Sequence, residues 1–349
     1  MAESNPSNSR DQVLELLAGH RSQRTPCFSG LMNVTAPGLE RIGVSFGEIH
    51  TDPEKMAAAA ATTYHSFGFE SVVVPMDLCV EAEALGAQVD FRLDAPRLEF
   101  PRVVEPLAAS ADEFKFDAPG DLTRRGRLPV VLEAIRRLKD LVGREIVVGA
   151  WVPGPLTLAM QLIDLKRLTA DVVRAPEAVG RLLDPLTDLL AEVGRAYRAA
   201  GADFITVHEM GGSPGFIGPP AFKNVVQPRL KRLIAALPAP RVLSVCGDTN
   251  RAITLLAECG ADALSLDQLN EIARTREALG PRALLFGNID PIGALVADGR
   301  DDETGVRRAV QGAIDAGVDA VWPGCDLWPL VSATNMQAMV DEARNYQRR

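Results

Sequence analysis

The sequence predicts an α/β protein whose chain forms a (β/α)8 barrel. Eight short apolar runs are each followed by a break and then by a longer helical pattern, as expected for alternating strands and helices. Three of these runs begin alike, in AAGADFITV, ECGADALSL and DAGVDAVWP, where a glycine ends a helix just before a strand. A doubly wound sheet would carry a glycine-rich phosphate loop after its first strand. The sequence has no such loop there, and the barrel is the better prediction.

The predicted elements can be placed in chain order. Residues 1–23 are expected to form an N-terminal helical extension, and residues 24–349 a single barrel domain. The segment Val80–Gly143, between the second and third strands, is an insertion whose PVVLEAIRRLKDLV stretch has the spacing of an amphipathic helix. We expect it to cover part of the barrel mouth. The eight strands are Pro26–Gly30, Ser71–Pro75, Glu145–Trp151, Asp203–His208, Arg241–Cys246, Ala263–Leu266, Ala283–Phe286 and Asp319–Trp322.

Composition excludes several classes of partner. The formal net charge of −9 and the sequence pI near 5.1 argue against binding to nucleic acid or to an anionic membrane, which both favour basic surfaces. The sequence has no apolar run long enough to span a bilayer and no signal-peptide pattern, so a cytoplasmic protein is expected. Five widely spaced cysteines without a C-x-x-C pair predict thiols or metal ligands, and no disulfide framework.

Polar and sulfur side chains recur at the predicted C-terminal ends of the strands. In a (β/α)8 barrel these ends meet at one mouth, where the chemistry takes place. We therefore expect the groups to face one cavity, as an active site requires. The residues concerned are Asn33, Asp77, Cys79, Glu209, Cys246, Asp267, Asn288, Asp290 and Cys325.

Each of these groups also has a simpler interpretation. Buried cysteine is common in protein cores, and Cys27 and Cys259 are assigned to the core. Cys246 and Cys325 follow strands, and together they could bind Zn²⁺ as a thiolate pair. For His208 a hydrogen-bonded structural histidine is the favoured interpretation.

The remaining alternatives are local. For Cys79, packing in its loop and contact with substrate are equally good interpretations. Asn288 and Asp290 could form an Asx turn ahead of Pro291.

From Arg24 almost to the C-terminus the chain resembles the uroporphyrinogen decarboxylase superfamily, and within it the corrinoid-dependent methyltransferases that include methylcobamide:coenzyme M methyltransferases. The resemblance implies a barrel of the uroporphyrinogen decarboxylase type. Decarboxylases of this superfamily carry an arginine-rich N-terminal motif, and CFSGLMNVTAPG has no arginine at that place. The segments that carry the resemblance are HTDPEKMAAAAATTYHSFGFESVVVPMDLCVEAEALGAQVDF, WVPGPLTLAMQL, SVCGDT, FGNIDP and PGCDLWPLVSATNM.

The resemblance also implies a zinc site. In the coenzyme M branch a His-x-Cys motif and a distant cysteine bind zinc, which activates the acceptor thiol. Cys246 and Cys325 match two of these ligands, and Ser244 stands where the histidine would be. A serine hydroxyl is a poor zinc ligand, so either Glu209 or His208 completes the site or the chain holds no metal.

A weakened zinc site favours an acceptor that needs no deprotonation, such as N5 of tetrahydrofolate. We therefore predict methyl transfer from methylcobalamin, carried by a separate corrinoid protein docked over the mouth, to tetrahydrofolate. The alternative is a zinc-dependent thiol methyltransferase. A uroporphyrinogen decarboxylase, disfavoured by the missing arginines, and a non-catalytic barrel that binds a corrinoid protein are weaker alternatives. A homodimer is left open. The predicted catalytic residues are Glu209, Asp267 and Asn288, the substrate contacts are Asn33, Asp77, Cys79, Asn288 and Asp290, and the metal ligands are Cys246, Cys325 and Glu209.

Overall fold

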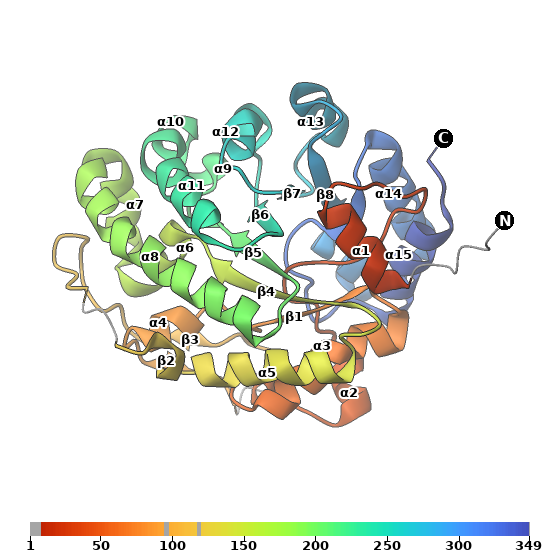
Figure 1. Ribbon diagram of the computed structural model, residues 1–349, viewed down its shortest axis with the longest axis horizontal. Coiled ribbons are helices and arrows are strands. Elements are labelled where there is room, and N and C mark those ends of the chain that lie inside the picture. The colour runs from red at the N-terminus through yellow and green to blue at the C-terminus, as the bar shows by residue number, and fades with distance from the viewer. Residues whose placement is uncertain (1–7, 94–97, 117–119, 349) are drawn as a thin grey trace.

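The computed structural model describes residues 8–93, 98–116 and 120–348, and its centre is a curled sheet of parallel strands (Figure 1). Seven strands are paired in the order β1-β4-β5-β6-β7-β8-β9. The predicted fold class is therefore confirmed. The strands are β1 (Ser71–Val74), β4 (Val147–Pro153), β5 (Phe204–His208), β6 (Arg241–Val245), β7 (Ala263–Leu266), β8 (Leu284–Ile289) and β9 (Ala320–Pro323).

The first predicted strand, Pro26–Gly30, is not a regular strand. Its contact with β9 is a single parallel bridge between Cys27 and Val321. On its other side the Ser71 hydroxyl at the start of β1 accepts a hydrogen bond from Ser29 N at 2.9 Å and donates one to Ser29 O at 2.8 Å. A side chain thus takes the place of part of a backbone ladder here, next to one backbone hydrogen bond from Glu70 N to Cys27 O at 2.9 Å. The segment still joins the two edge strands of the sheet.

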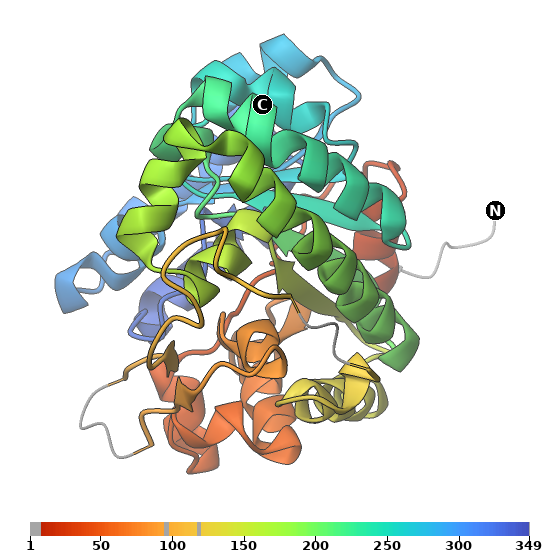
Figure 2. The ribbon, with the colours of Figure 1, turned by 90° about the vertical axis from the view of Figure 1, so that its left-hand side faces the viewer.

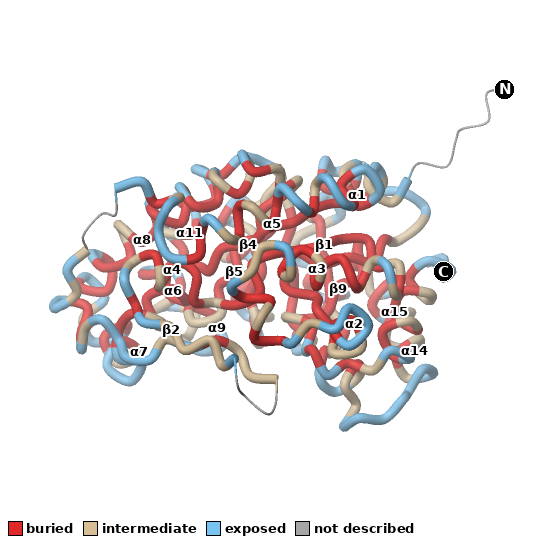
Figure 3. Tube along the Cα trace, turned by 90° about the horizontal axis from the view of Figure 1, so that it is seen from below, coloured by how far each residue is buried: buried red, intermediate tan, exposed pale blue. Residues whose placement is uncertain are grey.

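The helices surround the sheet, and their outer sides are exposed while the strands are buried (Figure 3). Local capping explains where they begin and end. In α3, Asp52 accepts hydrogen bonds from the backbone N–H groups of Glu54 and Lys55, Pro53 opens the first turn, and Gly68 ends the helix with φ +71°. The longer helices are α3 (Pro53–Phe67), α5 (Leu128–Leu141), α8 (Pro176–Ala200), α11 (Gln227–Ala236), α14 (Glu303–Ala316) and α15 (Ala333–Asn345).

Helix α1 (Ser9–Leu17) packs against the N-terminal ends of the strands. Its buried side chains Val13, Leu16 and Leu17 belong to one apolar cluster with the residues that open the strands, such as Val147 and Phe204. This packing fills the barrel at the end opposite the predicted active site. The functional groups are therefore to be sought at the C-terminal ends of the strands.

The insertion between β1 and β4 contains α4 (Val80–Ala84), the short antiparallel pair β2 (Val89–Asp90) and β3 (Arg102–Val103), and α5. The predicted amphipathic helix is α5, which buries its apolar side. It packs between α3 and α8 and against β1 and β4, on the side of the barrel that Figure 2 shows at the bottom. This helix thus covers the outer wall, whereas the insertion as a whole was expected at the mouth.

No helix among the described residues is long and apolar enough to span a membrane.

Candidate active site

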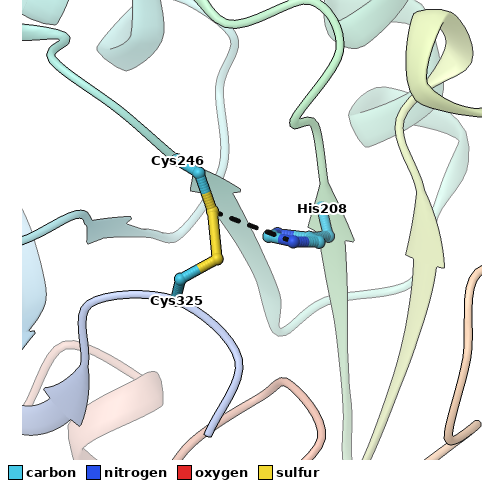
Figure 4. A group of neighbouring side chains, drawn as sticks. All are labelled: His208, Cys246 and Cys325. Atoms are coloured by element: carbon cyan, nitrogen blue, oxygen red, sulfur yellow. Dashed lines mark hydrogen bonds between the residues drawn. A yellow bond between two sulfur atoms is a disulfide. The ribbon is translucent and has the colours of Figure 1, made fainter. Parts of the chain in front are cut away.

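Three side chains from different strand ends converge at the mouth of the barrel (Figure 4). His208 is the last residue of β5, Cys246 directly follows β6, and Cys325 follows β9. Their potential metal-binding atoms, one imidazole nitrogen of His208 and the Sγ atoms of the two cysteines, all lie within 4.8 Å of one another. Cys246 Sγ is 3.9 Å from His208 Nε2. We call these three residues the sulfur–histidine cluster.

Cys246 and Cys325 are joined by a disulfide, with their Cα atoms 6.1 Å apart. The expectation of thiols or metal ligands without a disulfide was wrong for these two cysteines. It was drawn from the wide spacing of the cysteines and the absence of a C-x-x-C pair, whereas the predicted convergence of the strand ends places the two thiols within bonding distance. Reduction of this bond yields two thiolate donors beside an imidazole. The other cysteines, Cys27, Cys79 and Cys259, are free and buried.

The imidazole of His208 is fully buried and held from several sides. Its Nδ1 is 3.3 Å from the hydroxyl of Ser244, and its Nε2 is 3.6 Å from Asp326 Oδ2. The ring of Trp151 packs against it edge-on, with centroids 6.0 Å apart. The favoured interpretation of His208 as a structural histidine is incomplete, because the side chain is hydrogen-bonded and also faces the two sulfur atoms.

Glu209 is placed differently from its predicted metal and catalytic roles. Its carboxylate is buried and accepts hydrogen bonds from the backbone N–H groups of Leu156, Thr157 and Gly212 at 3.1, 3.0 and 2.9 Å, and from the Thr157 hydroxyl. Burial raises its pKa above the ordinary value, although these hydrogen bonds oppose the shift. The carboxylate caps the first turn of α6 (Pro155–Leu162) and fixes the loop after β5. The group that joins the cysteines is therefore the neighbouring His208.

Asp267 and Asn288 brace the loops around the cluster. The carboxylate of Asp267 accepts hydrogen bonds from Gly247 N and Leu269 N, each at 2.9 Å. Asn288 Nδ2 donates to the backbone oxygens of Asp267 and Asn270 at 3.3 and 3.0 Å. Gly247 directly follows Cys246, so Asp267 helps to fix the backbone that carries this thiol. Catalytic roles for Asp267 and Asn288 stay a prediction.

Asp290 adopts the geometry of the simpler alternative. Its Oδ1 accepts hydrogen bonds from Ile292 N at 2.9 Å and from Gly293 N at 2.8 Å. It caps the turn Pro291–Val296, as the Asx-turn interpretation expects. One oxygen of the carboxylate that was expected to contact substrate is thus engaged within the chain.

Asp77 lies in a buried charged network rather than beside the cluster. Its carboxylate accepts hydrogen bonds from Arg127 at 2.7 and 3.0 Å and from Cys79 N at 2.9 Å, and it pairs with His50 Nδ1 at 2.8 Å. Burial alone would raise the pKa of Asp77, but the His50 and Arg127 contacts outweigh it and hold the pKa well below the usual range. Nearby Glu81 is fully buried, and burial raises its pKa to about 8.

The last two predicted contacts are also buried. The Cys79 thiol donates to Pro101 O at 3.3 Å, and burial raises its pKa to about 12. The buried, hydrogen-bonded thiol agrees with the interpretation that Cys79 packs in its loop. Asn33 Nδ2 donates to Ser71 O at 3.2 Å, whereas its Oδ1 has no hydrogen-bond partner among the described residues. Asn33 therefore keeps one free acceptor.

Two charged groups were missed in the sequence, Asp326 beside His208 of the cluster and Arg127 in the buried network of Asp77. Asp326 directly follows Cys325, and its position in PGCD was the signal that could have found it. Arg127 had no local signal, because its partner Asp77 lies far away in the chain and in a different element.

A cavity lies beside the cluster rather than on it. It measures about 770 Å³ and lies between α2 (Ala36–Ile42), the loop before β3 and the loop after β9. Trp328, three residues after Cys325, lines it. Phe46, another lining residue, packs against Phe100, which in turn packs against Trp328. An apolar hollow thus adjoins the loop that carries the second thiol.

Comparison with known proteins gives consistent matches over nearly the whole chain. The family model described as uroporphyrinogen decarboxylase (URO-D) matches residues 8–346. The methylcobamide:CoM methyltransferase MtaA of Methanosarcina barkeri is 29% identical over 339 residues, covering 97% of this chain and 98% of the relative. The uroporphyrinogen decarboxylase of Syntrophotalea carbinolica is 30% identical over 261 residues, 71% of each chain. A solved methyltransferase from Methanosarcina mazei superposes with a TM-score of 0.90 at 27% identity, covering 96% of this chain and 98% of that one.

Proposed function

The chain belongs to the uroporphyrinogen decarboxylase family, and from this premise we propose that it is a methyltransferase that moves a methyl group from a methylated corrinoid to a thiol. The observation that carries the proposal is the sulfur–histidine cluster at the barrel mouth. A relative that matches nearly end to end is a methylcobamide:CoM methyltransferase. Its acceptor, CoM, is a thiol.

The donor set of the cluster fits zinc. Zinc binds cysteine sulfur at about 2.3 Å and histidine nitrogen at about 2.0–2.1 Å, so ligand atoms of one ion lie roughly 3–4 Å apart. The ligand atoms of His208, Cys246 and Cys325 lie within 4.8 Å of one another, and this is compatible with the spacing around one zinc ion. Three protein ligands leave a fourth position open, as catalytic zinc sites do. Cys246 and Cys325 can serve only when their disulfide is reduced, because the ligand is the thiolate.

The proposed reaction is an in-line displacement. Bound zinc would lower the pKa of the acceptor thiol. The acceptor sulfur, having lost its proton to solvent, forms a bond to the methyl carbon. The methyl–cobalt bond breaks at the same time, and its electron pair leaves with the corrinoid as Co(I). Cys246, Cys325 and His208 would hold the metal, and the packing of Trp151 against His208 shields that side of the imidazole from water.

Tetrahydrofolate is not supported as the acceptor. That prediction assumed a metal site weakened by Ser244, but His208 supplies a nitrogen ligand from the next strand. Two of the predicted pterin contacts, Asp77 and Asp290, are engaged in hydrogen bonds within the chain. The named relative uses CoM. The thiol alternative accounts for all of these observations.

We further propose that a corrinoid protein docks over the mouth. Large apolar side chains stand exposed on the loops that follow four different strands, which is unusual for a surface that stays in water. We call them the apolar rim. They are Phe216 after β5, Leu269 after β7, Ile292 after β8, and Trp328 and Leu330 after β9. A partner seated there would bring its corrinoid to the cluster.

The test compares two acceptors under a reductant. Zinc-loaded protein should demethylate methylcobalamin with coenzyme M and not with tetrahydrofolate. Cys246→Ala and Cys325→Ala should each lose zinc and thiol methylation, whereas Cys259→Ala, which removes a buried thiol elsewhere, should keep both. Demethylation with tetrahydrofolate alone, or full activity in Cys246→Ala, would overturn the proposal.

A further inference from the structure

His208 and Ser244 face each other on neighbouring strands. The parallel ladder of β5 and β6 pairs them directly. Ser244 precedes Cys246 by two residues on the same chain segment, so both side chains point to the same side of the sheet. Ser244 therefore lies on the strand that leads to the thiol, and its hydroxyl faces the imidazole on the neighbouring strand. It lies 3.3 Å from Nδ1 and is buried.

The direction of this hydrogen bond decides what the other ring nitrogen can do. A neutral imidazole has one N–H and one lone pair. If Nδ1 carries the proton, it donates to Ser244 Oγ, and Nε2 presents its lone pair toward Cys246 Sγ at 3.9 Å. If Nε2 carries the proton, it can donate to Asp326 Oδ2, which is 3.6 Å away, and it cannot bind a metal.

We infer that Ser244 is a positioning residue, whose hydroxyl accepts the Nδ1 proton of His208 and so directs the Nε2 lone pair at the two sulfur atoms. The inference rests on the proposed metal site and adds a condition to it. The nitrogen ligand comes from β5, and its orientation and tautomer are set from β6. Hydrogen bonds from groups outside the ligand set commonly fix the tautomer of a metal-binding histidine in this way.

Ser265 is the neighbour of Ser244 in the same row on the next strand, β7, and the two serines can be compared. Ser265 pairs with Ser244 in the ladder of β6 and β7, and its hydroxyl is buried without a hydrogen-bond partner among the described residues. A serine in this row is thus tolerated whether or not its hydroxyl is paired. What distinguishes Ser244 is its contact with His208. Ser265→Ala is therefore a matched control for Ser244→Ala.

The test measures metal affinity rather than turnover. Reduced protein is titrated with Zn²⁺ against a chromophoric chelator, and with Co²⁺ while its ligand-field absorption is recorded. Ser244→Ala should weaken Zn²⁺ binding by about 10- to 100-fold and change the Co²⁺ spectrum. Ser244→Thr keeps the hydroxyl and should restore both, and Ser265→Ala should change neither. Urea unfolding of the metal-free variants shows whether any loss is one of packing.

The outcomes separate this inference from the proposed function. Zn²⁺ affinity unchanged in His208→Ala would overturn the metal site itself. Affinity lost in His208→Ala but kept in Ser244→Ala would leave the site intact and overturn the role of Ser244. A loss in Ser244→Ala that Ser244→Thr does not restore would assign Ser244 to packing and also overturn the inference. The double variant His208→Ser/Ser244→His exchanges the two side chains across the ladder. It should partly recover the Zn²⁺ affinity that His208→Ser alone loses.

Discussion

Replacing Glu209 with glutamine tests whether this carboxylate supports the fold or binds the metal. Oε1 accepts three hydrogen bonds, from Thr157 N, the Thr157 hydroxyl and Gly212 N, whereas Oε2 accepts one, from Leu156 N. A glutamine oxygen in the place of Oε1 keeps the first three. Its amide nitrogen then faces Leu156 N–H, donor against donor. One buried donor left unsatisfied costs about 1–3 kcal/mol, and this is the expected loss in free energy of unfolding.

The measurement pairs urea denaturation of metal-free protein with zinc content after loading under a reductant. Glu209→Gln should lower stability by that amount and keep the zinc stoichiometry of the parent. Glu105→Gln, which changes an exposed carboxylate, should alter stability by less than about 0.5 kcal/mol. If Glu209→Gln has the same free energy of unfolding as the parent but loses its zinc, the carboxylate is a metal ligand and its structural role is refuted.

Three further predictions concern groups outside the cluster. Arg127→Met removes the arginine partner of the buried Asp77 carboxylate and leaves only the His50 contact, and it should cost about 3–5 kcal/mol in urea denaturation. The added change Asp77→Asn should recover part of that loss, and no recovery would count against the pairing. Burial raises the pKa of Glu81 to about 8 from 4.5, so its stabilising contribution is complete below pH 4.5 and is lost as pH rises through 8. The free energy of unfolding, measured from pH 5 to 9, should therefore fall less steeply with pH in Glu81→Gln than in the parent. Equal slopes would contradict the raised pKa. Asp290→Ala removes a cap and should cost about 0.5–2 kcal/mol with zinc affinity unchanged, whereas weaker zinc binding would return Asp290 to the site.

The barrel and the two thiols of the site were predictable because they depend on order along the chain. Parallel strands joined by helices bring every C-terminal strand end to one mouth. Cys246 and Cys325 each follow an apolar run, so their convergence follows from counting strands. The segment Pro26–Gly30 shows the limit of this reasoning. Its composition resembles that of a strand, but a serine side chain replaces part of its ladder, and composition does not reveal such a replacement.

The choice between His208 and Glu209 could not be made from alternation alone. Alternation says that adjacent residues point in opposite directions, but not which of the two faces the thiols. The fold makes the choice because it leaves room for the Glu209 carboxylate beside Gly154 and Gly212. A Cβ at either glycine would press against Glu209. The two glycines come from separate loops, and only the folded chain brings them together around Glu209. Information of this kind is spread over distant segments, and no local pattern carries it.

A metal site in a parallel barrel can keep its geometry while one ligand changes strand. Neighbouring strands lie only about 4.8 Å apart, so side chains at opposed positions can converge on one point. An imidazole on β5 can therefore reach a point that an imidazole opposite it on β6 would also reach. Ser244 and His208 occupy such a pair of opposed positions. A motif read along one strand finds serine and reports a missing ligand, whereas the ladder shows the histidine one strand away. For sites built on parallel sheets, the search for a missing ligand should therefore extend across the ladder before the site is judged incomplete.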